Sequence, residues 1–137
     1  MTTQRPANEP PIHGPQAAVE LLMTRTVARI SPSANLFEVA EKLAAVEVGA
    51  LVVGTVNEVT GIVSERDVTH ALGLGEDPYQ QHAEDIASHN LVWCDTGATV
   101  AEASRLMCEF GVRHLLVRDD ELRGIVSARD LLYAYVH

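Results

Sequence analysis

A seven-residue motif occurs twice in this chain. GIVSERD at residues 61–67 returns as GIVSARD at residues 124–130, with six of seven residues identical and a separation of 124 − 61 = 63. Upstream of the motif the separation is 64, and the matched positions are Asn35, Leu36, Glu38, Val48, Leu51 and Val53 in the first copy and Thr99, Val100, Glu102, Val112, Leu115 and Val117 in the second. Because self-similarity at a fixed spacing indicates duplicated structural units, two homologous halves account for nearly everything after residue 16.

The two halves are too short to be independent domains. The chain has 137 residues, 47% of them hydrophobic, so each half of about 60 residues buries too little surface to fold stably alone. We therefore expect one globular module with three parts. These are a flexible arm at 1–15, which holds four of the six prolines, a first repeat at 16–76 and a second repeat at 77–137.

Each half carries the same signals for local structure. Asn35 and Thr99 each precede an acid three residues later and then apolar residues at helical spacing, which predicts a capped amphipathic helix. A hairpin pattern follows, and then Ser64 or Ser127 stands directly before a second helical pattern. On these second helices the residues expected to face inward are Val68, Ala71 and Leu72, with their counterparts Leu131, Ala134 and Tyr135.

The expected order in each half is short strand, helix, strand, strand, helix. The fold class is therefore α/β (α+β): two pseudo-symmetric repeats, each a small three-stranded sheet packed with two helices. Between the repeats, Asp77-Pro78 is expected to open a short helix, because proline suits the first helical position.

Charge and composition exclude several classes of function. Nineteen acidic against ten basic side chains give a net charge of −9, which repels nucleic acid but still permits a nucleotide to bind at locally placed arginines and backbone amides. No apolar stretch reaches the ~18 residues that span a bilayer, and the N-terminus lacks the apolar segment of a secretory signal. A cytoplasmic protein without a membrane partner is expected. Cys94 and Cys108 are interpreted as buried thiols, with no metal-ligand spacing around them.

The doubled motif G-h-h-S-x-R-D, one copy at the end of the last strand of each half, resembles the signature of cystathionine-β-synthase-type (CBS) repeats. Two such repeats together resemble a Bateman module, here as a stand-alone chain, over about residues 17–137. The resemblance implies a non-catalytic regulatory module that requires no cofactor. Such a module binds AMP, ADP, ATP or S-adenosylmethionine in the cleft between the repeats, and thereby alters its assembly or the binding of an effector protein whose identity is unknown. A homodimer is also implied.

The motif positions carry over specific roles from the resemblance. Asp67 and Asp130 are implied to accept hydrogen bonds from ribose hydroxyls, with Ser64 and Ser127 beside the phosphate. Arg66 and Arg129 could supply positive charge to the phosphate. The alternative for each Ser-x-x-Asp set is an ordinary helix capping box, in which serine and aspartate satisfy backbone amides and need no ligand.

An adenine pocket is implied at the segments that enter the first strand of each half. Its wall residues would be Val27, Leu91 and Val92, which are equally well explained as core residues. Arg113 and His114 start the middle strand of the second half, where the first half has Gly49 and Ala50. This asymmetry indicates that the two sites differ in ligand preference or that only one is occupied.

Two alternative functions stay open. The same fold could serve as a ligand-free structural or protein-interaction module that acts through dimerisation, supported by its apolar helix faces. A metal site that combines Cys94 or Cys108 with a histidine is a weaker alternative. No nucleophile with a base, paired acids or metal-ligand motif indicates an enzyme.

Overall fold

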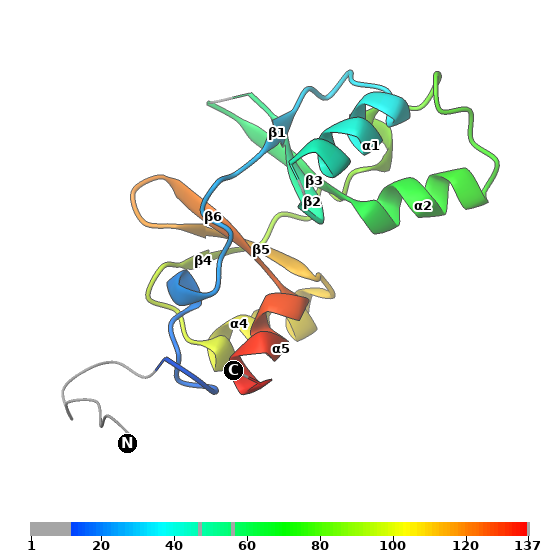
Figure 1. The fold of residues 1–137 in the computed structure, drawn as a ribbon. Coiled ribbons are helices and arrows are strands. Elements are labelled where there is room, and N and C mark those ends of the chain that lie inside the picture. Colours follow the sequence, from blue (N-terminus) through cyan, green and yellow to red (C-terminus); the bar gives the residue numbers. More distant parts are fainter. Residues whose placement is uncertain (1–11, 47, 56, 137) are drawn as a thin grey trace. The chain divides into compact units, whose positions relative to one another are not determined.

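A computed structural model describes residues 12–46, 48–55 and 57–136, so most of the predicted arm at 1–15 lies outside the described residues. The chain divides into two compact units, shown in Figure 1. One unit comprises residues 26–91, and the other joins the described residues up to 25 to residues 92–136. We refer to them as the inner unit and the outer unit, after their positions in the sequence.

The inner unit is a three-stranded sheet with helices on one of its faces (Figure 1). Its strands are β1 (Arg29–Ile30), β2 (Ala50–Gly54) and β3 (Val59–Ser64), and its helices are α1 (Leu36–Ala45), α2 (Glu65–Gly73) and α3 (Ala83–Ile86). β1 runs parallel to β2, and β2 runs antiparallel to β3. The predicted order of strand, helix, strand, strand, helix is therefore confirmed for this half.

The outer unit repeats this arrangement. It contains η1 (Val19–Leu21), β4 (Trp93–Asp95), α4 (Val100–Phe110), β5 (His114–Arg118), β6 (Leu122–Ser127) and α5 (Ala128–Val136). β4 is parallel to β5, β5 is antiparallel to β6, and both hairpins carry a register irregularity near the end of the first strand. The predicted fold class, two pseudo-repeats each with a three-stranded sheet and helices, is confirmed.

Helix starts follow from the capping residues that the sequence predicted. Asn35 and Glu38 form both halves of a capping box at α1, and Thr99 Oγ1 accepts from Glu102 N at 3.1 Å at α4. Gly111 ends α4 at φ 65°, a left-handed conformation in which a side chain is strained. The expected helix at Asp77-Pro78 is wrong: Asp77 Oδ1 accepts from Tyr79 N in a turn, and α3 begins only at Ala83.

Each unit has its own hydrophobic cluster between sheet and helices. In the inner unit Leu51, Val53 and Val63 face Val39, Leu43 and Val68, and in the outer unit Leu115, Val117 and Val126 face Val100, Met107 and Leu131. Ala71 and Ala134 are buried as predicted, but Leu72 and Tyr135 are 50% and 60% exposed. The inward prediction for these two is wrong, because α2 and α5 bury a narrower stripe than the sequence pattern indicated.

The segments that lead into each repeat pair with the last strand of the other repeat. Thr24 exchanges backbone hydrogen bonds with Ile125 of β6, at 2.8 and 3.1 Å, and Ser88 does so with Ile62 of β3, at 2.9 Å each. The two pairs are related by the duplication, since 24 + 64 = 88 and 62 + 63 = 125. The compact units therefore differ from the two sequence repeats by an exchange of these lead-in segments.

A matched pair of glycine substitutions tests the assignment of helix ends. Gly111→Ala should lower the free energy of unfolding by about 1 kcal/mol, because alanine is strained at a left-handed φ. The loss should appear as a lower urea midpoint. Gly73→Ala, in the last turn of α2 with open space around its Cβ position, should raise stability by about 0.5 kcal/mol. Equal effects of the two changes in urea unfolding would contradict the assignment.

Candidate functional site

The predicted site residues of the inner unit gather at one end of its sheet. β3 ends at Ser64, which pairs with Ala50 at the start of β2. Because β1 is parallel to β2, its lead-in reaches the same end, where Ala28 O accepts from Val52 N at 2.9 Å. Val27, just before Ala28, and the start of α2, just after Ser64, therefore lie toward this end.

Ser64 and Asp67 form a reciprocal cap at this end. Asp67 Oδ2 accepts from Ser64 N at 2.7 Å and from Ser64 Oγ at 2.9 Å, and Ser64 Oγ accepts from Asp67 N at 3.3 Å. The amide of Glu65 donates to Gly49 O at 3.1 Å. The capping alternative from the sequence is therefore present in the structure, and it binds the start of α2 to the neighbouring strand.

The outer unit has the same cap in a more polar setting. Asp130 Oδ2 accepts from Ser127 N at 2.8 Å, and Ser127 Oγ accepts from Asp130 N at 3.0 Å. His114 pairs with Ser127 across the hairpin, and Arg113 O accepts from Ala128 N at 2.9 Å. Four of the predicted site residues, Arg113, His114, Ser127 and Asp130, thus meet at one sheet end, whereas Gly49 and Ala50 stand in the equivalent places of the inner unit.

The caps determine which groups remain for a ligand. In each unit two amides of the first helical turn already donate to protein oxygens, which reduces the capacity of the helix start to bind an anion. These bonds to the aspartates use Oδ2, so Oδ1 lies outside the cap. A carboxylate with one oxygen in a cap retains a second acceptor for donors such as hydroxyls.

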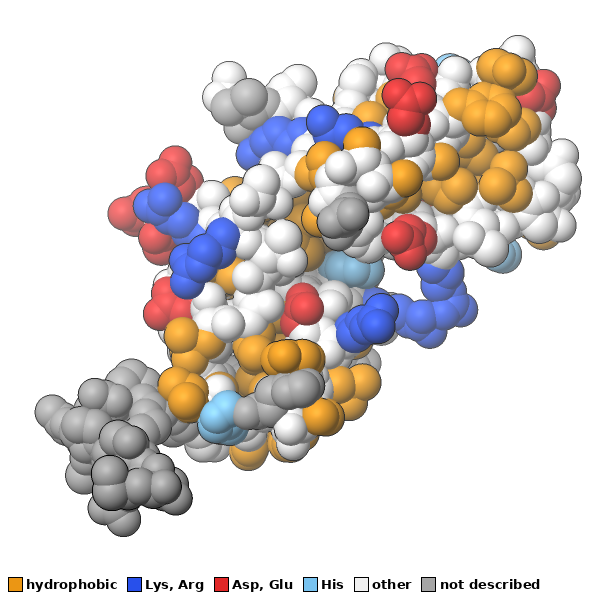
Figure 2. Space-filling model, viewed as in Figure 1, with side chains coloured by type: hydrophobic (Ala, Val, Ile, Leu, Met, Phe, Trp, Pro, Cys, Tyr) orange, Lys and Arg blue, Asp and Glu red, His pale blue; other side chains and the backbone are white. Residues whose placement is uncertain are grey.

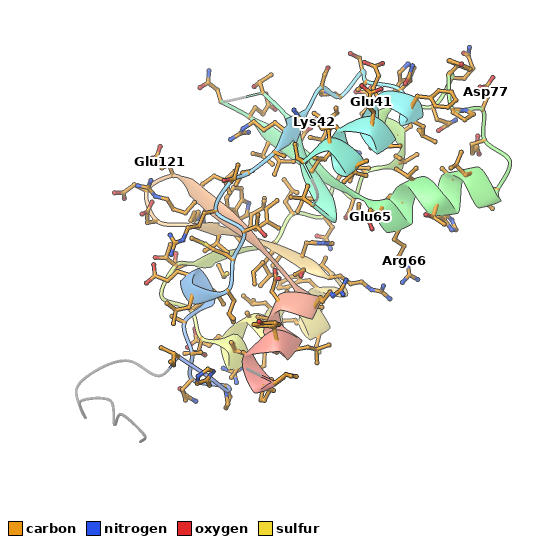
Figure 3. The ribbon with its side chains drawn as sticks, in the orientation of Figure 1. Glu41, Lys42, Glu65, Arg66, Asp77 and Glu121 are labelled. Carbon is orange, nitrogen blue, oxygen red and sulfur yellow. The ribbon has the colours of Figure 1, made fainter. Side chains whose placement is uncertain are left out.

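Arg66 and Arg129 occupy the second position of α2 and α5, and both are exposed. Figure 3 shows the Arg66 side chain extending away from α2. An exposed guanidinium on a flexible stem attracts phosphate without fixing its position.

The residues predicted to form the adenine wall have different surroundings. Val92 is 8% exposed and belongs to the outer unit's hydrophobic cluster, with its carbonyl accepting from Leu116 N at 3.0 Å. This matches its alternative interpretation as a core residue. Val27 and Leu91 are half-buried, which leaves part of each side chain accessible.

Sequence reasoning missed the exchanged lead-in segments, including Thr24, Ser88 and the residues beside them. The 64-residue offset could have indicated that these segments are also duplicated, because Val19 and Ala83 are related by that offset and both begin short helical segments. Strand pairing between different repeats is not visible in hydrophobic periodicity, however, because a single hydrogen-bonded residue has no period.

The two cysteines differ in environment. Cys94 is buried in the outer cluster, and its burial, with the nearby carboxylates of Asp95 and Glu102, raises the pKa of the thiol to about 11. Cys108 is exposed on α4, so its interpretation as a buried thiol is wrong. Among the described residues no group of three or more His, Cys, Asp or Glu side chains could hold a metal ion.

The chain belongs to the CBS-domain family. The family model described as CBS domain matches residues 18–74 and 83–137, two copies that correspond to the duplicated halves. The protein is thus a tandem CBS module, a kind of domain that is generally regulatory. No helix in the described part of the chain is long and apolar enough to cross a membrane.

Individual relatives agree with this assignment. The chain is 35% identical to the uncharacterized protein MK0525 of Methanopyrus kandleri over 112 residues, which cover 79% of this chain and 57% of that protein. The crystal structure of the CBS-domain protein ATU1752 from Agrobacterium tumefaciens is 30% identical, with a TM-score of 0.74 over 85% of this chain and 92% of the other. A hexameric CBS-CP12 protein from bloom-forming cyanobacteria is 25% identical, with a TM-score of 0.76 over 85% and 69% of the two chains.

Thiol chemistry should distinguish the cysteines. At about pH 8 a disulfide reagent should react rapidly with Cys108, while Cys94 stays protonated and buried and reacts only on unfolding. Reagent uptake by the native protein and by Cys108→Ser checks this. Rapid reaction in the variant would show that Cys94 is accessible and would contradict the burial described above.

Proposed function

We propose that this module binds an adenosine-containing ligand of the AMP, ADP, ATP or S-adenosylmethionine class, and that it acts by regulation without catalysing a reaction. The observation that carries the proposal is the Ser–Asp pair at the sheet end of each unit. Both aspartates keep Oδ1 outside the cap, and a ribose offers two neighbouring hydroxyl donors to such an oxygen. Ser64 and Ser127 are then the neighbours of the phosphate.

The outer unit is the better candidate for a charged ligand. Arg113 and His114 lie beside Ser127 and Asp130, and Arg129 extends the positive charge. In the inner unit Arg66 lies next to the cap in the sequence, and Gly49 and Ala50 stand in the places of the polar pair. Phosphate-bearing nucleotides should therefore favour the outer unit, because a phosphate requires locally placed cations when the net charge is −9.

Regulation would follow from linkage. A ligand that binds one arrangement of the module more tightly shifts the equilibrium by no more than its differential affinity, and an effector protein reads the shift. No cofactor and no bond-making step is part of this function. A cytoplasmic location is consistent with such a ligand and stays a prediction.

Ligand titration tests the proposal. The thermal midpoint of the purified protein should rise with at least one of AMP, ADP, ATP and S-adenosylmethionine, and a ligand at 100 times its Kd should add about 2.7 kcal/mol of stability. The absence of any shift at millimolar concentrations of all four compounds would refute the proposal.

Substitutions in the caps separate ligand binding from capping. Asp67→Ala and Asp130→Ala should each lose about 1 kcal/mol of stability and also abolish the ligand shift at their site. Glu38→Ala is the matched control, because Glu38 forms the same kind of capping box at α1, which follows β1 and therefore starts toward the opposite end of the inner sheet from Ser64. The Glu38→Ala protein should lose a similar free energy of unfolding and keep the full rise in thermal midpoint with ligand. Calorimetric titration then compares the ligand affinities of the three variants. Equal ligand affinity in all three variants would limit the aspartates to capping.

A second function, assembly into a homodimer, is favoured by the exposed apolar side chains of the second helices. Leu72 and Leu74 at the end of α2, and Leu132, Tyr135 and Val136 on α5, are each at least half exposed. Figure 2 shows hydrophobic side chains gathered on the surface over α1 and α2. Several exposed apolar side chains on one helix are typical of interaction surfaces. The CBS-CP12 relative is described as hexameric.

Sedimentation equilibrium tests the dimer. The wild-type protein should sediment as a dimer, and the equivalent changes Leu72→Asp and Tyr135→Asp should give monomers without loss of fold, because both side chains are exposed. Leu21→Asp is the control, since Leu21 is also exposed but lies in η1. A monomeric wild type, or dissociation caused equally by the control, would contradict this function.

A further inference from the structure

His89 joins two backbone carbonyls of the inner unit. Its Nδ1 lies 2.8 Å from Thr60 O, on β3, and its Nε2 lies 2.8 Å from Glu84 O, on α3. The imidazole therefore bridges the outer strand of the sheet and the short helix of the lead-in segment.

The two contacts require a particular protonation state. A carbonyl oxygen only accepts, so each ring nitrogen must donate for both hydrogen bonds to form. A neutral imidazole carries one N–H and would place a nitrogen lone pair against the second carbonyl. Only the imidazolium satisfies both contacts.

The first repeat has a permanently charged residue at the matching position. Arg25 occupies the position equivalent to His89, since 25 + 64 = 89, and its guanidinium donates to Glu20 O at 3.0 Å. Glu20 is in turn the equivalent of Glu84, since 20 + 64 = 84. The lead-in segment of the first repeat thus carries a cation that is always charged and bonds within its own segment, whereas that of the second carries a group that titrates near neutrality.

The segment that His89 ties down lies close against β3. A Cβ at Gly61 would be 3.0 Å from Ser88 O, 3.2 Å from Ala87 Cβ and 3.3 Å from His89 Nδ1, so a side chain at this position would crowd the lead-in segment. Next to it, Ile62 and Ser88 exchange both backbone hydrogen bonds at 2.9 Å. His89 stands directly after this pair, where the chain leaves the inner unit at Leu91.

The charged surroundings favour the imidazolium. β3 carries no ionisable side chain, and α3 with its N-cap carries Glu84, Asp85 and His82. Asp85 pairs with His82 at 3.3 Å, whereas Glu84 acts on His89. The hydrogen bond to Thr60 O, then that to Glu84 O and the Glu84 charge, raise the pKa of His89 above 6.5, while desolvation opposes them.

We propose that His89 is a proton-operated clamp that fastens the lead-in segment 83–89 to the edge of β3 when protonated and loosens it when neutral, while the equivalent segment of the outer unit has Arg25, which stays charged at every physiological pH, in place of this histidine. The module then carries one pH-sensitive junction, at His89, and no group that titrates near neutrality at the matching position of the first repeat. This regulation is independent of any nucleotide.

The wild-type protein itself provides the test. A group whose folded pKa is raised stabilises the folded state fully below its unfolded pKa, and this contribution is lost as pH rises through the folded pKa. NMR titration should therefore give His89 a pKa above 6.5. Hydrogen exchange of the Ile62 and Ser88 amides is then compared with that of the Thr24 and Ile125 amides, after correction for intrinsic exchange rates. Between about pH 5 and about pH 8, the protection of Ile62 and Ser88 should fall at least about twofold relative to that of Thr24 and Ile125.

Two variants complete the experiment. His89→Arg places a permanently charged side chain with several donors at this position and should keep the protection of Ile62 and Ser88 while removing its pH dependence. His89→Ala should lose the extra protection at both pH values. A His89 pKa at or below 6.5, a protection ratio independent of pH in the wild type, or a pH dependence that persists in either variant would overturn the proposal.

Discussion

Two small sets of backbone hydrogen bonds connect the start of each repeat to the last strand of the other. Thr24 pairs with Ile125, and Ser88 pairs with Ile62. An outer strand with unpaired N–H and C=O groups invites aggregation, and here β3 and β6, one outer strand of each sheet, receive a partner segment from the other repeat. The same exchange brings Val19 and Met23 into the outer cluster and Ala83 into the inner one. Each hydrophobic cluster is thereby built from residues of both repeats.

The Ser–Asp caps combine a structural role with a candidate binding role. The cap holds the first turn of α2 or α5 against the sheet end, which fixes where the aspartate points. A group that is rigid before a ligand arrives loses little conformational entropy on binding, so the capping role prepares the binding role instead of competing with it. The cost is at the helix start, where amides donate to Gly49, Arg113 and the serine hydroxyls. For that reason the phosphate of the proposed ligand would depend more on cationic side chains than on backbone amides.

Duplication followed by divergence explains the differences between the units. Arg113 and His114 replace Gly49 and Ala50 at the outer sheet end, and His89 stands where the first lead-in has Arg25. In both cases the backbone geometry is shared and the side-chain chemistry differs. Equivalent positions of one architecture therefore carry different side-chain chemistry, which is the basis of the different ligand preference and proton sensitivity proposed for the two units.

The sequence alone determined the duplication, the order of elements, the caps at Asn35, Ser64 and Ser127, and the family, because these depend on local patterns and on self-similarity. It also named the residues that the sheet ends bring together, since antiparallel pairing places the start of β5 beside the end of β6. Only the tertiary structure decided that Leu72, Tyr135 and Cys108 face outward, because the width of a buried stripe depends on what packs against it. It alone revealed the exchanged lead-in segments and the two carbonyls around His89, since a contact across 29 residues leaves no periodic trace in the chain.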